Sequence, residues 1–196
     1  MKTIIYTHPY AGSFNHEILN RLSNSFSKND EEFEIINPYA DNFNPTLTDA
    51  ELKLYSQGKT DDELVKRYQR RIAASDELIF IFPIWWQGMP AMLKGFLDKT
   101  MLNGFAYNED NGWEGLLTYI KRVTVITTST VPVSYLERDC GNPIKDVFIN
   151  RTLADFGIDP NTVNWIHFGE VNVTTDEKRE RFLDDIPQLY ADNKKA

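Results

Sequence analysis

Apolar residues along the chain fall into short continuous runs separated by stretches with helical spacing. The runs rich in β-branched and aromatic residues predict strands over residues 2–6, 33–36, 77–82, 122–128 and 162–168. Between these runs, apolar residues recur three or four positions apart, which predicts helices with one buried face. We expect these helices from about residue 15 and over 48–55, 61–75, 91–101, 143–156 and 175–190.

Three stretches lack both patterns and are predicted to be loops. Residues 38–47 are rich in proline and asparagine, residues 103–117 are rich in glycine and aromatic side chains, and residues 129–142 follow a buried strand. Thr48 and Glu51 have the spacing of a capping box, which favours a helix start at this point. Gly157 is a suitable stop for the helix before it.

The order of elements, strand then helix, repeats about five times. This order predicts a three-layer α/β fold with a parallel sheet, right-handed crossovers and helices on both faces. Five strands favour the flavodoxin-like order 2-1-3-4-5, in which ligands bind beyond the carboxyl ends of strands 1, 3 and 4. Loops 8–15, 83–90 and 127–135 are therefore expected to form the site. The length of 196 residues suits a single domain over 1–196.

Composition and charge argue against several classes of function for this chain. The chain carries 29 acidic and 21 basic residues, a formal charge of −8, which disfavours nucleic acid and anionic membranes as partners. The single cysteine, Cys140, excludes an intramolecular disulfide framework. The apolar run at 78–86 is too short for a membrane span, so no stable membrane insertion is expected. No secretory signal is visible, and we therefore expect a cytoplasmic protein.

The first of the three loops has the chemistry of an anion site. It reads His-Pro-Tyr-Ala-Gly-Ser-Phe-Asn over residues 8–15 and leads into a predicted helix, whose free N–H groups suit a phosphate. Gly12 permits unusual backbone angles, and Ser13 adds a hydroxyl group. The sequence is neither GxGxxG nor a P-loop. An ordinary helix cap is therefore the alternative interpretation of this loop.

The other two loops offer aromatic and hydroxyl side chains. Loop 83–90 places Trp85 and Trp86 directly after a buried strand, where indole rings suit a flat heteroaromatic ligand. Core packing under the next helix is the alternative. Loop 127–135 begins with four hydroxyl residues, which supply hydrogen-bond donors or form a solvated turn. Tyr135 is either a donor to a ligand oxygen or a packing tyrosine.

Other chemistries have little support in the sequence. His8, His16 and His167 lack the spacing of zinc ligands, so no metal site is expected. None of the serines lies in the GxSxG pattern of a serine hydrolase. Nothing near Cys140 in the sequence marks a base that would activate its thiol.

Several of these segments together resemble a known family. They are the tripeptide Ser13-Phe14-Asn15 after His8, the block FPIWWQGMPAMLKGF over residues 82–96, Gly104-Phe105-Ala106-Tyr107, the pair Thr127-Thr128, and Tyr135. In this order, over roughly residues 3–157, they resemble the flavodoxin-like NAD(P)H:quinone oxidoreductases, which include DT-diaphorase and shorter bacterial relatives. The middle block is the most specific part of the resemblance.

The resemblance implies a non-covalent flavin, either FMN or FAD, at the interface of a homodimer. The residues implied to face the flavin phosphate and ribityl chain are His8, Gly12, Ser13, Phe14 and Asn15. Those implied to border the isoalloxazine ring are Pro83, Ile84, Trp85, Trp86 and Gln87. Those implied to close its pyrimidine side are Thr127, Thr128, Ser129, Thr130 and Tyr135. Phe105 and Tyr107 are implied to reach the substrate pocket of the partner subunit.

The function implied is ping-pong transfer of hydride from NAD(P)H, as co-substrate, through the flavin to a quinone or similar planar acceptor. Tyr135 is implied to assist catalysis by stabilising negative charge on the reduced flavin, together with backbone N–H groups near 128–130. A flavodoxin-type electron carrier and a flavin-binding regulatory subunit of a membrane transporter are the alternatives. The sequence does not distinguish FMN from FAD as the cofactor, or NADH from NADPH as the co-substrate.

Two positions depart from the pattern of the larger family members. Ser129-Thr130 stands where those members have a Gly-Gly pair, which alters how closely the backbone can approach the ring. Gly141 stands where they have a histidine that is proposed to assist charge relay. A histidine-assisted relay is therefore not assumed for this chain.

Overall fold

The computed structural model describes residues 1–110 and 112–191. Its centre is a five-stranded parallel sheet in the order β2-β1-β3-β6-β7. The strands are β2 (Phe33–Ile36), β1 (Lys2–Tyr6), β3 (Glu77–Pro83), β6 (Arg122–Thr128) and β7 (Val163–Phe168). Counted within this sheet alone, the order is the predicted 2-1-3-4-5, so the predicted fold class is confirmed.

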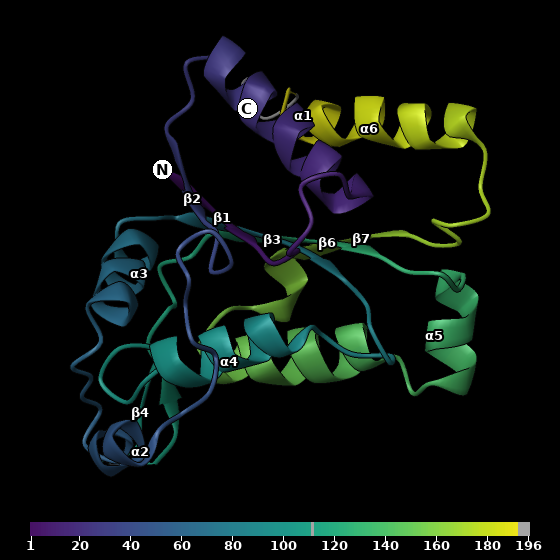
Figure 1. Cartoon of the computed structure of the whole chain (residues 1–196). Helices are drawn as coiled ribbons and strands as arrows, with labels where there is room; N and C mark the ends of the chain where they lie inside the picture. Colours follow the sequence, from purple (N-terminus) through teal and green to yellow (C-terminus); the bar gives the residue numbers. More distant parts are fainter. Residues whose placement is uncertain (111, 192–196) are drawn as a thin grey trace.

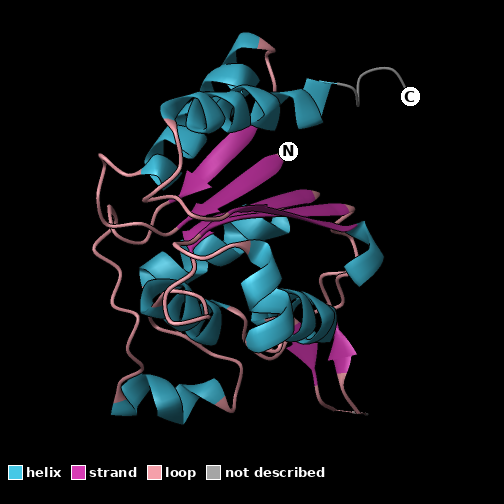
Figure 2. Cartoon of the chain, turned by 90° about the vertical axis from the view of Figure 1, so that its right-hand side faces the viewer, coloured by secondary structure: helices cyan, strands magenta, loops and turns pink. Residues whose placement is uncertain are grey.

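Helices cover both faces of the sheet and give the molecule three layers (Figures 1 and 2). One face carries α1 (Phe14–Lys28) and α6 (Asp176–Ala191). The other face carries α3 (Glu63–Ala73), α4 (Ala91–Thr100) and η1 (Pro143–Leu153). Among the described residues, no helix is both long and apolar enough to cross a membrane.

Both faces of the central strand β3 are covered by helices, which explains its almost continuously apolar sequence. Ile79 and Ile81 belong to the hydrophobic cluster with α1 and α6, whereas Phe80 and Phe82 pack in the cluster with α4 and η1. All four side chains are fully buried. A strand covered on both faces favours apolar side chains along most of its length, as the sequence pattern predicts.

Short elements occur in two stretches that were expected to be loops, and these expectations are wrong. Residues 103–117 contain an antiparallel pair, β4 (Tyr107–Asn108) and β5 (Glu114–Gly115). Residues 129–142 contain α5 (Val133–Asp139) at the right of Figure 1. The pair has two residues in each strand, and α5 buries only Leu136, so neither element leaves a periodic apolar pattern.

The remaining elements lie where the sequence predicts them, but some differ in helix type or in their first or last residue. α2 (Asp49–Tyr55) begins with the predicted capping box of Thr48 and Glu51. The helix expected over 143–156 is a π-helix and ends at Leu153. A 3₁₀ turn, η2 (Pro160–Thr162), precedes β7, which starts one residue later than expected.

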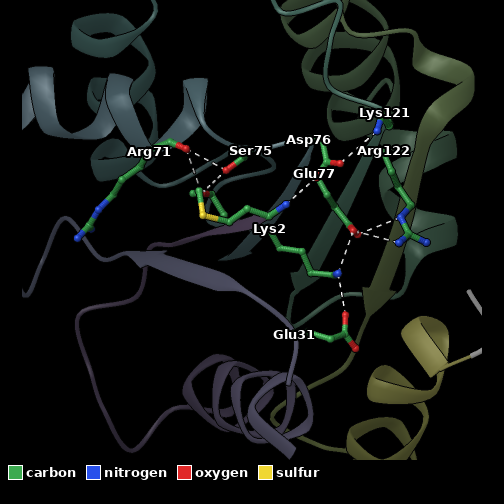
Figure 3. Close-up of polar contacts among 10 residues, drawn as sticks. Lys2, Glu31, Arg71, Ser75, Asp76, Glu77, Lys121 and Arg122 are labelled. Atoms are coloured by element: carbon green, nitrogen blue, oxygen red, sulfur yellow. Dashed lines mark hydrogen bonds and ion pairs between the residues drawn. The ribbon is translucent and has the colours of Figure 1, made fainter. Parts of the chain in front are cut away.

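The amino ends of the three central strands are joined by charged side chains (Figure 3). Lys2, Glu77 and Arg122 are register partners across β1, β3 and β6. Arg122 contacts Glu77 at 3.0 Å, and Lys2 lies 3.7 Å from Glu77 and 2.7 Å from Glu31. This charged end of the sheet lies opposite the carboxyl ends, where the sequence predicts the site.

Candidate functional site

A pocket of about 330 Å³ lies at the carboxyl ends of β1, β3 and β6. All three predicted loops contribute to its lining. The predicted residues that it brings together are His8, Gly12, Ser13, Phe14, Asn15, Pro83, Ile84, Trp85, Thr128, Ser129 and Thr130. Tyr10, Val171 and Asn172 also line it and were missed. The signal that could have found the last two is topological, because the segment after β7 reaches the same edge of the sheet.

The first loop closes one end of the pocket over the start of α1. The Ser13 hydroxyl caps this helix by accepting from the backbone N–H of His16 at 3.1 Å. The ring of Tyr10 lies over Gly12, where an added Cβ would approach the Tyr10 Cζ atom to 2.4 Å. The loop is thus an ordinary helix cap that also exposes N–H groups suited to a phosphate.

Asn15 connects the first loop to the third. Its side-chain Nδ2 donates to the Thr128 hydroxyl at 2.7 Å, and the residue is only 3% exposed. Its Oδ1 atom is buried and has no hydrogen-bond partner among the described residues. Because buried polar atoms are nearly always paired, this acceptor favours a ligand that brings a hydroxyl or N–H group into the pocket.

The second loop makes a tight turn with a strained backbone. Trp85 and Gly88 exchange two backbone hydrogen bonds of 3.0 and 3.1 Å. The two residues between them, Trp86 and Gln87, have φ values of 48° and 60°. Left-handed angles at both central positions are typical of a type I′ turn and cost free energy for residues other than glycine. Conformational strain of this kind is concentrated at functional sites.

This turn separates the two tryptophans. Trp85 lines the pocket, and its ring meets the ring of His8 edge-on at a centroid distance of 5.8 Å. Trp86 is 96% exposed at the tip of the turn, and neither it nor Gln87 is part of the pocket lining. Burial lowers the pKa of His8 below its ordinary value of 6.5. The imidazole beside Trp85 is therefore neutral near pH 7.

The third loop is held from both sides of the sheet. Thr128 lies toward α1 and bonds to Asn15, whereas Thr127 is fully buried on the other face and does not line the pocket. The backbone N–H of Ile84 donates to the Thr128 carbonyl at 2.7 Å, which ties the second loop to the third. The hydroxyls of Thr127 and Ser129 are both bonded to the ring of His167.

Besides Trp86, Gln87 and Thr127, three further predicted residues lie outside this pocket. Tyr135 is on α5 and is 39% exposed. Phe105 packs against the core on the α4 side. Tyr107 lines a second cavity of about 290 Å³ between α4 and η1, where it stacks on Trp113 at 4.3 Å. A single chain therefore does not bring Phe105 and Tyr107 to the pocket at the carboxyl ends of the strands.

Comparison with known proteins supplies the context for this site. A family model described as a flavodoxin-like fold matches residues 2–189. An uncharacterized NAD(P)H oxidoreductase of Haemophilus influenzae is 30% identical over 183 residues, which cover 92% of this chain and 89% of that protein. The rat NAD(P)H dehydrogenase (quinone) 1 is 28% identical over 121 residues, 53% of this chain and 44% of the rat protein.

A solved structure agrees with the sequence relatives. The NAD(P)H:quinone oxidoreductase of Methanothermobacter marburgensis superposes with a TM-score of 0.80 at 26% sequence identity. The superposition covers 95% of each of the two chains. The similarity therefore extends over nearly the whole chain.

Proposed function

Because this chain belongs to the family of proteins with a flavodoxin-like fold, we propose that it is a flavin-dependent NAD(P)H:quinone oxidoreductase. The names of its relatives support this proposal, since one is an NAD(P)H oxidoreductase and two are quinone-reducing enzymes. The cofactor is FMN or FAD, bound without a covalent link, and NAD(P)H is the co-substrate. A quinone or similar planar molecule is the acceptor.

The observation that carries the proposal is the chemistry of the pocket at the carboxyl ends of β1, β3 and β6. It combines a helix N-terminus for a phosphate, an unpaired buried acceptor on Asn15 and an aromatic wall at Trp85. These are the groups that a phosphate, a hydroxylated chain and a flat ring each require. The residues present therefore fit a flavin.

The bound flavin supplies the hydride chemistry. The chain's own residues bind and orient it. The start of α1 and the Ser13 hydroxyl would hold the phosphate, and the Asn15 Oδ1 would accept from the ribityl chain. Trp85 would border the ring, and Thr128 and Thr130 would contribute backbone groups to its binding. NAD(P)H would be the source of the hydride, and the quinone or similar molecule would be its acceptor.

We further propose a homodimer in which Phe105 and Tyr107 of one subunit reach the acceptor site of the other. Exposed aromatic side chains support this assembly, since Trp86 is 96% and Trp113 is 56% exposed. Large exposed apolar groups of this kind mark interaction surfaces. Trp113 stacks on the buried ring of Tyr107 in the lining of the second cavity, which holds the two rings together.

Steady-state assays test the enzymatic proposal against the alternatives. Purified protein is loaded with FMN or FAD, and NADH and NADPH consumption is followed with menadione as acceptor. Sustained consumption that requires both menadione and flavin is the expected result. A protein that binds flavin and consumes neither nucleotide is an electron carrier or a regulatory subunit, and that outcome contradicts the proposed activity.

A further inference from the structure

His167 occupies a particular position beside the third loop of the site. It lies near the end of β7, and its register partner on the neighbouring strand β6 is Thr127. Trp165, two residues earlier, lies on the same face of the sheet because strand side chains alternate. These side chains form a connected set with Ser129, the first residue after β6.

The directions of the hydrogen bonds in this set follow from what each group can donate. The Trp165 indole N–H can only donate, and it lies 2.9 Å from the Thr127 oxygen. The hydroxyl hydrogen of Thr127 is then free to donate to His167 Nδ1, at 2.8 Å. With Thr127 as the donor to Nδ1, His167 carries its proton on Nε2 and donates to the Ser129 oxygen at 3.0 Å. Ser129 in turn donates to the Val131 carbonyl at 2.5 Å.

The opposite tautomer satisfies fewer groups. With the proton on Nδ1, the Nε2 atom would need the hydrogen of the Ser129 hydroxyl, and the close contact between Ser129 Oγ and the Val131 carbonyl would lose its hydrogen. Only the Nε2–H form therefore pairs every donor and acceptor in the set. Burial also lowers the pKa of His167, with a smaller opposing effect from the Val131 carbonyl, and this favours the neutral ring.

The set fixes the backbone that turns away from the end of β6. The Ser129 N–H donates to the Phe168 carbonyl, and the Val171 N–H donates to the Ser129 carbonyl, both at 3.0 Å. Ser129 is thus bound to β7 and its following loop through its main chain and its side chain. On the other face, Asn15 holds the side chain of Thr128. Thr128 and Thr130, which line the pocket, stand on either side of this fixed residue.

We propose that His167 is a positioning residue for the flavin: its neutral Nε2–H ring orients the backbone of residues 128–130 toward the pyrimidine edge, where negative charge gathers on reduction. This inference rests on the proposed function. Preorganised N–H groups stabilise charge because they need no rearrangement when it develops. His167 acts through Thr127 and Ser129, and it is absent from the pocket lining.

The first test examines the flavin-free protein. Nitrogen-15 NMR of the imidazole side chains near neutral pH reports which ring nitrogen of His167 carries the proton. The expected result is a protonated Nε2 and an unprotonated Nδ1 signal, assigned by loss of the signals in His167→Gln. A proton on Nδ1, or a doubly protonated ring, overturns the assignment.

The second test measures the dissociation constants of oxidised and dithionite-reduced FMN by fluorescence and anaerobic absorbance titration. His167→Phe keeps a planar ring and removes both hydrogen bonds. Reduced FMN should bind about tenfold more weakly, a change of about 1.4 kcal/mol, and oxidised FMN should be affected less. The midpoint potential of the bound flavin therefore becomes more negative. His167→Gln restores a donor near the Nε2 position, so it is expected to recover part of the loss.

Ile166→Val is the matched control, because Ile166 lies on the same strand and packs in the cluster with α1 and α6. It weakens β7 without removing a hydrogen bond from the third loop. If His167→Phe and Ile166→Val change the two constants alike, His167 is only structural and the inference is wrong. If wild-type protein binds neither FMN nor FAD, the proposed function itself fails. Flavin binding by wild type with an unchanged potential in both His167 variants contradicts the role of His167 alone.

Discussion

At the scale of single residues, the site depends on a few side chains whose polar atoms are almost completely paired. Asn15 is the exception, because its Nδ2 bonds Thr128 while its Oδ1 remains unpaired in the described structure. A buried acceptor without a partner costs free energy until a ligand satisfies it. The proposed flavin pocket is therefore expected to gain stability when it is filled, and a substitution at Asn15 should reduce this gain.

Asn15→Ala removes both the bond to Thr128 and the unpaired acceptor. We expect flavin affinity to fall about tenfold, since a hydrogen bond contributes about 1 kcal/mol or somewhat more. Fluorescence titration with FMN measures this change. Asn20→Ala is the control on the same helix, because the Asn20 side chain bonds Glu17 and does not line the pocket. An affinity unchanged in Asn15→Ala would contradict the proposed contact.

Tyr135→Phe tests the proposed catalytic hydroxyl. Tyr135 is partly exposed on α5 and does not line the pocket of the single chain. The variant is expected to slow flavin reduction by NAD(P)H and to leave flavin binding intact, because only one donor to the developing charge is lost. Rapid mixing of the loaded protein with NADPH gives the rate. A rate equal to that of wild type would show that Tyr135 has no such role.

Two histidines make stability depend on pH in a defined direction. Burial lowers the pKa of His8 and of His167 below 6.5 in the folded chain. The unfolded chain therefore binds these protons first as pH falls, and the free energy of unfolding decreases below about pH 6.5. Thermal denaturation between about pH 7.5 and 5.5 should show a falling midpoint.

The carboxyl group of Asp76 also titrates, but at a lower pH than the two histidines. Asp76, whose pKa is lowered mainly by its bond to the N-terminal ammonium group, affects stability only as pH approaches 3.8 and below. Asp76 therefore does not change the free energy of unfolding in the pH range where the histidines titrate. Replacing His167 with Gln should flatten the curve relative to wild type. A curve that stays equally steep would exclude His167 as a source of the pH dependence.

At the scale of elements, the strands and longer helices were predictable because burial leaves a strong pattern. The apolar residues of β3 and β6 fix their identity as covered strands. β4 and β5 were not predictable, because each strand has only two residues and their packing includes a contact distant in sequence. Gly115 of β5 lies against Gly157, where an added Cβ would come within 2.0 Å of the Gly157 nitrogen. No local pattern encodes such a contact.

The charged ends of β1, β3 and β6 provide a prediction at this scale (Figure 3). Glu77, with a side chain only 7% exposed, lies between Lys2 and Arg122. Glu77→Gln leaves two partly buried cations without their shared carboxylate, so the free energy of unfolding should fall by about 3 kcal/mol. Urea denaturation measures the change, and FMN affinity should be unaffected because the site is at the opposite ends of the strands.

Lys121 supplies the matched control for this experiment. Its side chain is 79% exposed and pairs with Asp76 at 3.3 Å. Exposed ion pairs contribute about 1 kcal/mol or less, so Lys121→Met should have little effect on unfolding. Equal effects of the two substitutions would contradict the importance of the buried carboxylate.

At the scale of the whole molecule, topology brings together segments that are far apart in the chain. The loops after β1, β3 and β6 could be named from the sequence, because the carboxyl ends of parallel strands meet at one edge. The outward position of Trp86 could not, since it depends on left-handed angles that sequence does not favour for tryptophan and glutamine. The hydrogen-bond network around His167 could not be predicted from the sequence either, because its members come from two strands.

The position of Tyr107 outside the pocket at the carboxyl ends of the strands bears on the proposed homodimer. Tyr107 lines a different cavity of the single chain, so its proposed contribution to the acceptor site requires a second subunit. In the proposed homodimer, the flavin pocket is formed by one chain and the acceptor site is shared between two.

Anaerobic addition of NADPH or NADH to the flavin-loaded protein tests the central claim most directly. We expect a yellow protein whose visible flavin absorption bleaches within seconds of mixing and returns when menadione is added. This result would establish hydride transfer from the nucleotide through the flavin to a quinone. A flavin that stays oxidised in the presence of both nucleotides would contradict the oxidoreductase, and a protein that takes up neither FMN nor FAD would contradict the flavin site.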